Sequence, residues 1–169
     1  MLFRSLPSIG GNIRVGQSET FVTEACEYTN SFLSFFPKIS VILNIDADHL
    51  DFFKDIDDIR HSFRKFAQLL PADGALIINA DTPHYQDIIK DLSCKIITYG
   101  LEHEAQYQAT DITYDKYGHA SFTVLKDGRK AGSFYLKVPG SHNVSNALAA
   151  IALARLLQIP NDVIVKGLG

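Results

Sequence analysis

The stretch "VILNIDADHLDFF" (residues 41–53) changes from an apolar run to a cluster of polar side chains within a few residues. A short run of Val, Ile and Leu is typical of a strand buried in a parallel sheet. The polar residues that follow are an amide, three carboxylates and an imidazole, namely Asn44, Asp46, Asp48, His49 and Asp51. Open α/β sheets bind ligands outside the carboxyl ends of their strands, so this cluster is a candidate site.

The segments on either side of this stretch alternate between strand and helix patterns. We predict strands over residues 19–25, 39–45, 74–80 and 95–100, and helices over residues 57–71 and 82–92. Thr82, which is followed by Pro83, is the expected N-cap of the second helix. Because strands and helices take turns along the chain, this half favours a parallel sheet with right-handed crossovers.

The second half of the chain changes to a period of two, which is typical of half-exposed strands. Residues 106–115, 119–127 and 131–140 alternate in this way, with a hairpin turn at "KDGRK". Residues 141–159 are apolar nearly all round and predict a buried helix with Ser141 as N-cap, while Asn161 should cap a further helix. The predicted fold class is therefore α/β: one domain over residues 1–169, with a mostly parallel sheet flanked by helices and a small added antiparallel sheet.

Composition and charge exclude several classes of function. The 169 residues carry a net charge of −3 and their Lys and Arg residues are scattered, so we expect no nucleic-acid partner. No apolar run approaches the roughly 18 residues of a membrane span, and the first residues do not resemble a signal peptide. The two cysteines are far apart and fit neither a metal nor a redox spacing, so a reducing cytoplasm is the expected compartment.

A second carboxylate is predicted to lie near the polar cluster. Glu24 follows Phe21 and Val22 at the end of the first predicted strand. Neighbouring parallel strands lie about 4.8 Å apart, so Glu24 and His49 should converge within roughly 10 Å on one crevice. Mg²⁺ prefers a few carboxylates together with water and phosphate oxygens. The alternative is that these acidic residues only solvate surface loops.

A second constellation, "GSHNVSNALAA", begins the predicted buried helix. His142, Asn143 and Asn146 fall on one face of its first turns. An Asn side chain carries both a donor and an acceptor, which suits the edge of a nucleobase. The alternative is that the Asn residues only cap the helix.

Five stretches occur together in an order and spacing that resemble a known family. They are "TEACEYTNSFLSFFP", "VILNIDADHLDFF", "GALIINADTP", "ITYG" and "VPGSHNVSNALAAIALA". The chain resembles the central domain of the Mur ligases from about Gly10 onward, and "N-x-x-x-D-H-x-D" with "G-x-H-N-x-x-N-A" are its specific elements. The "ACEY" and "DADHLD" segments favour the alanine-adding member of the family.

The resemblance implies an ATP-dependent ligase of peptidoglycan synthesis with a P-loop NTPase-like core. Such an enzyme activates the carboxylate of UDP-N-acetylmuramate as an acyl phosphate, which the amine of L-alanine then attacks. Its cofactors would be ATP and Mg²⁺, and its partners the two substrates. The implied metal ligands are Glu24 and His49, the implied catalytic residues are His49, Asn44 and Asp48, and the implied adenine contacts are His142, Asn143 and Asn146.

The sequence also departs from the family pattern. It contains neither G-x-x-x-x-G-K-[ST] nor G-x-G-x-x-G, whereas the family carries a Walker A loop upstream of the matching region. Some sister ligases carry a carbamylated Lys fifteen residues after the metal-binding His, where this chain has Arg64. We therefore expect a partial central domain, without its Walker A loop and terminal domains, that is inactive alone. A sheet edge exposed in this way would favour self-association.

Two other classes of function are compatible with the same residues. The chain could be a nucleotide-binding or interaction module without catalysis, and would then bind adenine nucleotide without any other chain. It could also be a small metal-dependent hydrolase built on "DADHLD", although that class usually needs more His ligands from other strand ends.

Overall fold

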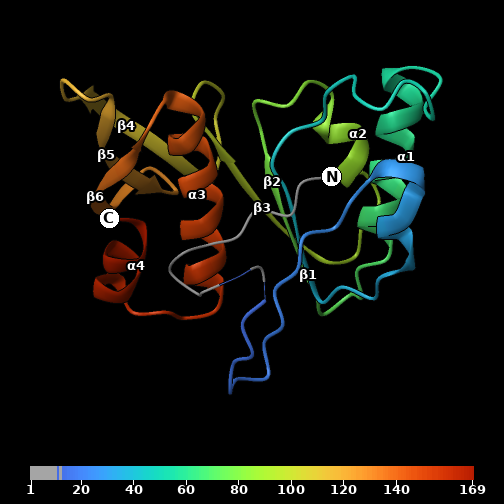
Figure 1. The fold of residues 1–169 in the computed structure, drawn as a ribbon, viewed down its shortest axis with the longest axis horizontal. Helices are drawn as coiled ribbons and strands as arrows, with labels where there is room; N and C mark the ends of the chain where they lie inside the picture. Colours follow the sequence, from blue (N-terminus) through green and yellow to red (C-terminus); the bar gives the residue numbers. More distant parts are fainter. Residues whose placement is uncertain (1–10, 12) are drawn as a thin grey trace.

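The computed structural model describes Gly11 and residues 13–169, and it arranges them as one mixed sheet with helices on both sides (Figure 1). The elements in chain order are η2 (Tyr28–Ser34), β1 (Ile39–Ile42), α1 (Ile56–Gln68), β2 (Ala75–Asn79), α2 (Tyr85–Ile89), β3 (Lys95–Gly100), β4 (Tyr107–Tyr114), β5 (His119–Lys126), β6 (Arg129–Pro139), α3 (Ser141–Leu156) and α4 (Asn161–Leu168).

The six strands follow one another across a single sheet in the order β1-β2-β3-β4-β5-β6. Pairing is parallel from β1 to β4 and antiparallel from β4 to β6. The predicted antiparallel strands are thus not a separate sheet, because β4 pairs with β3 through Tyr99–Tyr107 and Gly100–Gln108. The predicted α/β class, with a mostly parallel sheet and an antiparallel addition, is confirmed.

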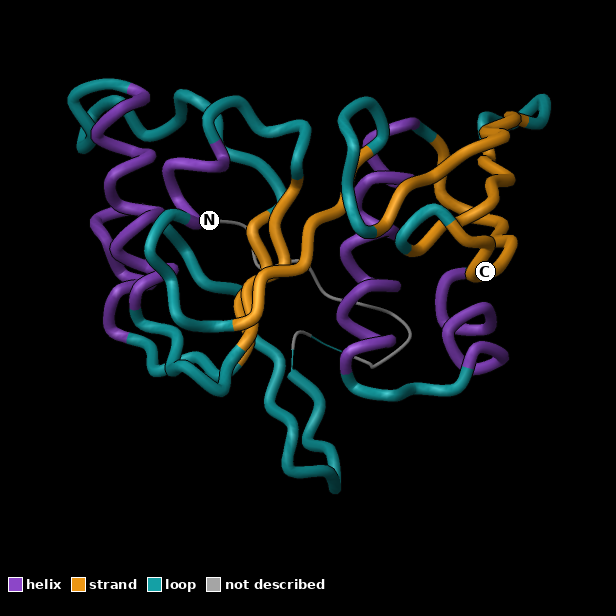
Figure 2. The backbone as a smooth tube through the Cα atoms, turned by 180° about the vertical axis from the view of Figure 1, so that it is seen from behind, coloured by secondary structure: helices purple, strands orange, loops and turns teal. Residues whose placement is uncertain are grey.

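The sheet separates two hydrophobic cores. Seen from behind, η2, α1 and α2 lie on one side of β1–β3, and α3 and α4 lie on the other (Figure 2). In β2, Leu76 and Ile78 face the α1 side, whereas Ile77 faces the α3 side, and all three are fully buried. This burial on both faces explains why the strand reads as a continuous apolar run.

The strand predicted over residues 19–25 is wrong. The structure gives this segment no regular element, and Phe21 and Val22 are exposed. High β-propensity does not form a strand unless a neighbour supplies backbone hydrogen bonds. In the described part of the chain, β1 is the first strand of the sheet and pairs with β2, and this segment does not join the sheet.

Three predicted helix N-caps are also wrong, because a different residue occupies each N-cap position. The N-cap of α2 is His84, in the left-handed region at φ 63°, and not Thr82. α3 begins at Ser141 after the N-cap Gly140, where φ is 104° and a Cβ would lie only 2.7 Å from Cε1 of His142. Pro160 is the N-cap of α4, and Asn161 is the first residue of that helix. The Asn161 side chain accepts a hydrogen bond from Arg155.

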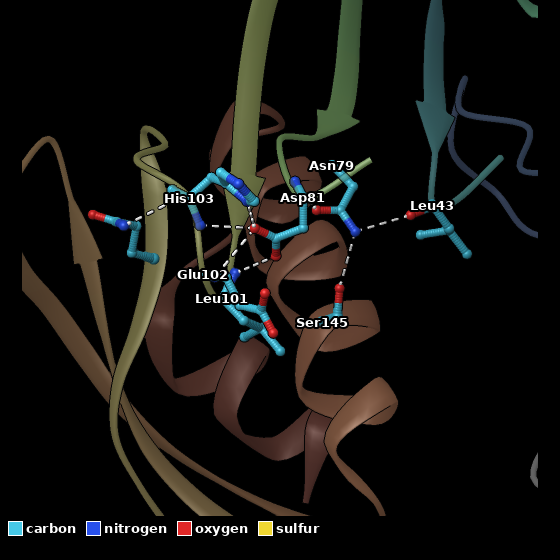
Figure 3. A network of polar contacts seen from close by, with 8 residues as sticks. Leu43, Asn79, Asp81, Leu101, Glu102, His103 and Ser145 are labelled. Atoms are coloured by element: carbon cyan, nitrogen blue, oxygen red, sulfur yellow. Dashed lines mark hydrogen bonds and ion pairs between the residues drawn. The ribbon is translucent and has the colours of Figure 1, made fainter. Parts of the chain in front are cut away.

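Asp81, which follows β2, holds the connection between β3 and β4 (Figure 3). Its carboxylate accepts backbone N–H bonds from Leu101 (2.6 Å), Glu102 (3.1 Å) and His103 (2.8 Å). Nδ1 of His103 lies 3.0 Å from the same carboxylate. Partial burial by itself raises the pKa of Asp81, but these hydrogen bonds outweigh it and hold the pKa below its ordinary value.

We expect Asp81→Asn to lower the free energy of unfolding by about 1–3 kcal/mol, because the amide turns one acceptor into a donor facing backbone N–H groups. The folded-state pKa is lowered, so this contribution is complete above the unfolded value of about 3.9 and is lost as pH falls through the folded value. Urea unfolding at several pH values should show the difference shrinking below about pH 4. Asp87→Asn, at an exposed α2 carboxylate, is the matched control. Equal effects of the two substitutions would contradict the assignment.

Candidate functional site

The polar cluster after β1 folds into a loop that is held by its own side chains. Nδ2 of Asn44 donates to Asp46 (2.6 Å), and Asp48 accepts the backbone N–H of His49 (2.7 Å). His49 lies in the left-handed region at φ 55°, and its carbonyl accepts N–H bonds from Phe52 and Phe53. Asn44 and Asp48 therefore orient the loop that presents His49.

Glu27, at the N-cap position of η2, is the carboxylate that contacts His49. Its Oε1 lies 3.4 Å from Nε2 of His49, and both side chains are about one-third exposed. Asp48 Oδ2 lies 4.0 Å from the same nitrogen. The loop after β1 and the turn before η2 thus bring an imidazole and a carboxylate together although they are distant in sequence.

The structure places Glu24 on the exposed stretch before this turn, where its carbonyl accepts a hydrogen bond from Thr23. The reasoning that brought Glu24 to His49 from an adjacent strand end is wrong, since no strand forms there. Its role as a metal ligand stays a prediction. Glu27 belongs to the same "TEACEY" segment, so the sequence marked the segment but did not single out this carboxylate.

The turn that presents Glu27 is fixed by buried anchors. Thr29 and Asn30 both adopt left-handed backbone conformations, and Asn30 pairs with the buried Ser62 of α1. Phe32 is 1% exposed and stacks on Phe66 with ring centroids 4.6 Å apart. The contacts of this turn with α1 therefore fix the position of Glu27.

The predicted nucleobase contacts lie at the start of α3. His142 and Asn146 are exposed, and the His142 ring lies over Gly140. Nδ2 of Asn143 donates to the carbonyl of Pro139 (2.7 Å), and its backbone N–H donates to Gly140. For Asn143 this contact favours the alternative, a side chain that holds the junction of β6 and α3. The adenine role of all three residues stays a prediction.

Asn79, at the end of β2, links the strand ends to α3 (Figure 3). Its Nδ2 donates to the carbonyl of Leu43 (3.2 Å) and lies 3.5 Å from Oγ of Ser145. The hydroxyl of Tyr99 also donates to Leu43 (3.2 Å). Burial, with a smaller contribution from the charge of Asp81, strongly raises the pKa of Tyr99, which therefore stays a donor. Sequence reasoning missed Asn79, although a polar residue closing an apolar strand was a signal.

The pair of Glu27 and His49 fits a divalent ion that takes only part of its ligands from the protein. Mg²⁺ is usually bound through one or two carboxylates, with water and phosphate oxygens completing the octahedron. Over the described part of the chain, no group of three or more His, Cys, Asp or Glu residues is arranged to hold a metal. A single carboxylate is compatible with an ion that takes its other ligands from water and phosphate oxygens. Within the same residues, no helix is long and apolar enough to cross a membrane.

Curated relatives are similar to nearly all of this chain but are much longer. A UDP-N-acetylmuramate–L-alanine ligase from Lachnospira eligens is 54% identical over 164 residues, which are 96% of this chain and 36% of that protein. The enzyme of the same name from Agathobacter rectalis is 55% identical over 163 residues, again 96% and 36%. The chain thus spans about a third of the length of the curated relatives it matches.

Solved structures show the same fold. MurF from Acinetobacter baumannii has a TM-score of 0.71 at 27% identity, covering 82% of this chain and 30% of that one. The UDP-N-acetylmuramate:L-alanyl-gamma-D-glutamyl-meso-diaminopimelate ligase from Neisseria meningitides has a TM-score of 0.70 at 31% identity, covering 82% and 41%. Residues 5–154 match the family described as the Mur ligase middle domain, which confirms the resemblance. The chain belongs to the Mur ligase middle-domain family.

Proposed function

We propose that this chain is the nucleotide-binding middle part of a UDP-N-acetylmuramate–L-alanine ligase, a cytoplasmic enzyme of bacterial peptidoglycan synthesis. Relatives that carry this name are 54% and 55% identical to it over nearly its whole length. The ligase would join L-alanine to UDP-N-acetylmuramate through an acyl phosphate. Mur ligases use ATP, and the site described above lies where an open α/β sheet binds such ligands.

The observation that carries this proposal is the contact between Glu27 and His49 at the end of β1. We propose that His49 Nε2 and Glu27 Oε1 bind Mg²⁺, and Glu24, from the same segment, stays a further candidate ligand. A bound Mg²⁺ neutralises the negative charge of phosphate and carboxylate groups that must approach one another. In this proposal Asp48 fixes the backbone of His49, and Asn44 fixes the loop through Asp46.

We further propose that the adenine end of ATP lies at the start of α3, against His142 and Asn146. Asn143 would act indirectly, because its side-chain amide donates a hydrogen bond to the carbonyl of Pro139 and so fixes the junction of β6 and α3. The link from Leu43 through Asn79 to Ser145 supports one continuous site, since it joins the strand before His49 to the first turns of α3. Other parts of the ligase would supply the phosphate-binding loop and the binding sites for UDP-N-acetylmuramate and L-alanine.

The two alternative functions differ in their support. A metal-dependent hydrolase needs several protein ligands, and the described residues form no group of three. A nucleotide-binding module without catalysis would use the same strand ends, and it differs from the proposal in how tightly the isolated chain binds ATP.

We expect Glu27→Gln and His49→Ala each to raise the Kd for Mn²⁺ about tenfold, because each removes one donor atom of a small site. Electron paramagnetic resonance of free Mn²⁺ measures this directly. Glu24→Gln tests the sequence-based ligand, and His119→Ala removes another His next to a carboxylate, at 3.1 Å from Asp115. His119→Ala should leave the Kd for Mn²⁺ unchanged, because His119 lies in β5, outside the site. Glu24→Gln should raise the Kd only if Glu24 is also a ligand. Weakening by Glu24→Gln but not by Glu27→Gln would restore the sequence-based assignment.

We expect the isolated chain to bind Mg·ATP with a Kd above about 10 μM by calorimetry. Backbone amides and a Lys of a Walker loop carry most phosphate binding in such folds, and this sequence has no such motif. His142→Ala should weaken binding further, whereas Asn143→Ala should chiefly lower the stability of the chain. A Kd below 10 μM would instead support the stand-alone nucleotide-binding module.

A further inference from the structure

The side-chain amide of Asn79 contacts three different segments of the chain. Its Oδ1 accepts the backbone N–H of Asp81 (2.9 Å), in the turn after β2. Its Nδ2 donates to the carbonyl of Leu43 (3.2 Å) and lies 3.5 Å from Oγ of Ser145 (Figure 3). One amide therefore joins the turn after β2, the exit from β1 and the first turns of α3.

The amide lies on a face of β2 that is otherwise apolar. Side chains alternate between the two faces of a strand, so Asn79 follows the fully buried Ile77 on the α3 side of the sheet. The carbonyl of Leu43 already accepts a second hydrogen bond, from the hydroxyl of Tyr99 (3.2 Å). The Nδ2 group of Asn79 is thus not needed to satisfy that carbonyl. What Asn79 adds is the connection from Leu43 to Ser145.

We propose that Asn79 is a positioning residue that couples the two ends of the proposed site, which are the loop carrying His49 and the start of α3. This inference rests on the proposed function, in which His49 binds a divalent ion and the adenine lies at α3. It holds whichever carboxylate of the "TEACEY" segment joins His49 at the ion. Asn79 acts through Leu43 and Ser145, and binds neither the ion nor the nucleotide.

The distances in this link explain how one end can affect the other. Because Leu43 is held by Asn79, a movement of the loop that carries His49 is passed on to the amide. N–H···O bonds usually span about 2.7–3.2 Å, so the contact with Ser145 is at its limit, and a shift of a few tenths of an ångström strengthens or breaks it. Ser145 is followed by the exposed Asn146, where the adenine is proposed to lie. By linkage, a ligand at α3 changes the affinity for the ion by the same factor.

The link is separable from the packing that stabilises the sheet. Ile77 and Tyr99 are fully buried, whereas Asn79 and Ser145 are half-buried. Ser145→Ala should not weaken α3, because Ala has a higher helix propensity than Ser. Asn79→Asp keeps the acceptor for the N–H of Asp81 and replaces the donor to the other two segments by an acceptor.

The test follows amide NMR signals of the ¹⁵N-labelled chain, with Mg²⁺ alone as the probe. Asn79→Asp cuts the link at its centre, Ser145→Ala cuts it at α3, and Ser145→Thr retains the hydroxyl. Thr98→Val is the matched control, since Oγ1 of Thr98 accepts the N–H of Gln106 (3.0 Å) between β3 and β4, away from the link. Urea unfolding of each variant checks the fold.

In the unsubstituted chain, we expect saturating Mg²⁺ to shift the amide signals of His49 and of Asn146. In Asn79→Asp and Ser145→Ala the signal of His49 should still shift, and that of Asn146 should no longer do so. Ser145→Thr and Thr98→Val should respond like the unsubstituted chain. If Mg²⁺ shifts the Asn146 signal equally in all variants, or shifts only that of His49 in the unsubstituted chain, the coupling is overturned.

Failure of the proposed function gives a different result. If Mg²⁺ does not shift the amide signal of His49 in the unsubstituted chain, the metal site is wrong, and the spectra without metal decide the link by themselves. A shift of the Asn44 and His49 signals in Ser145→Ala, with none in Thr98→Val, supports a link from α3 to the loop. Unchanged loop signals in Ser145→Ala overturn it.

Discussion

The carbonyl of Leu43 is the constraint on which the site depends. It is the first backbone acceptor beyond β1, and it receives two hydrogen bonds, from Nδ2 of Asn79 and the hydroxyl of Tyr99. The two donors come from β2 and β3, so the carboxyl ends of three parallel strands are joined at one atom. The chain leaves the sheet there and enters the loop that carries His49. Two donors from the neighbouring strands on one carbonyl therefore fix the point at which the chain leaves the sheet.

The two hydrophobic cores approach this exit point from opposite faces of the sheet. On one face, Phe32 packs against α1 and fixes the turn that carries Glu27. On the other face, the buried helix α3 places Ser145 within reach of Asn79. Residues that are distant in sequence therefore meet at one edge because each belongs to a rigid core. Two acidic side chains of the loop after β1, Asp46 and Asp48, accept hydrogen bonds from within that loop.

Much of this arrangement could be predicted from the sequence, and the failures have a common cause. Apolar runs and periodicity gave β2, β3 and the two long helices, because burial on one or both faces leaves a pattern in the residues. Patterns do not give the partner of an edge segment, so the expected strand over residues 19–25 was wrong. They also did not predict that Glu27 contacts His49. That contact depends on a turn with two left-handed residues, Thr29 and Asn30, which contacts with α1 stabilise.

The central claim is that the loop after β1 and the turn before η2 together form a divalent-metal site. Paramagnetic broadening by Mn²⁺ in the amide NMR spectrum of the ¹⁵N-labelled chain tests it most directly, since broadening falls off steeply with distance from the ion. At substoichiometric Mn²⁺, the amides of Glu27 and His49 should broaden first, followed by that of Asn44. The hairpin residues Asp127 and Gly128 should stay sharp. Broadening centred on Asp115 and His119, with the amides of Glu27 and His49 unaffected, would contradict the account.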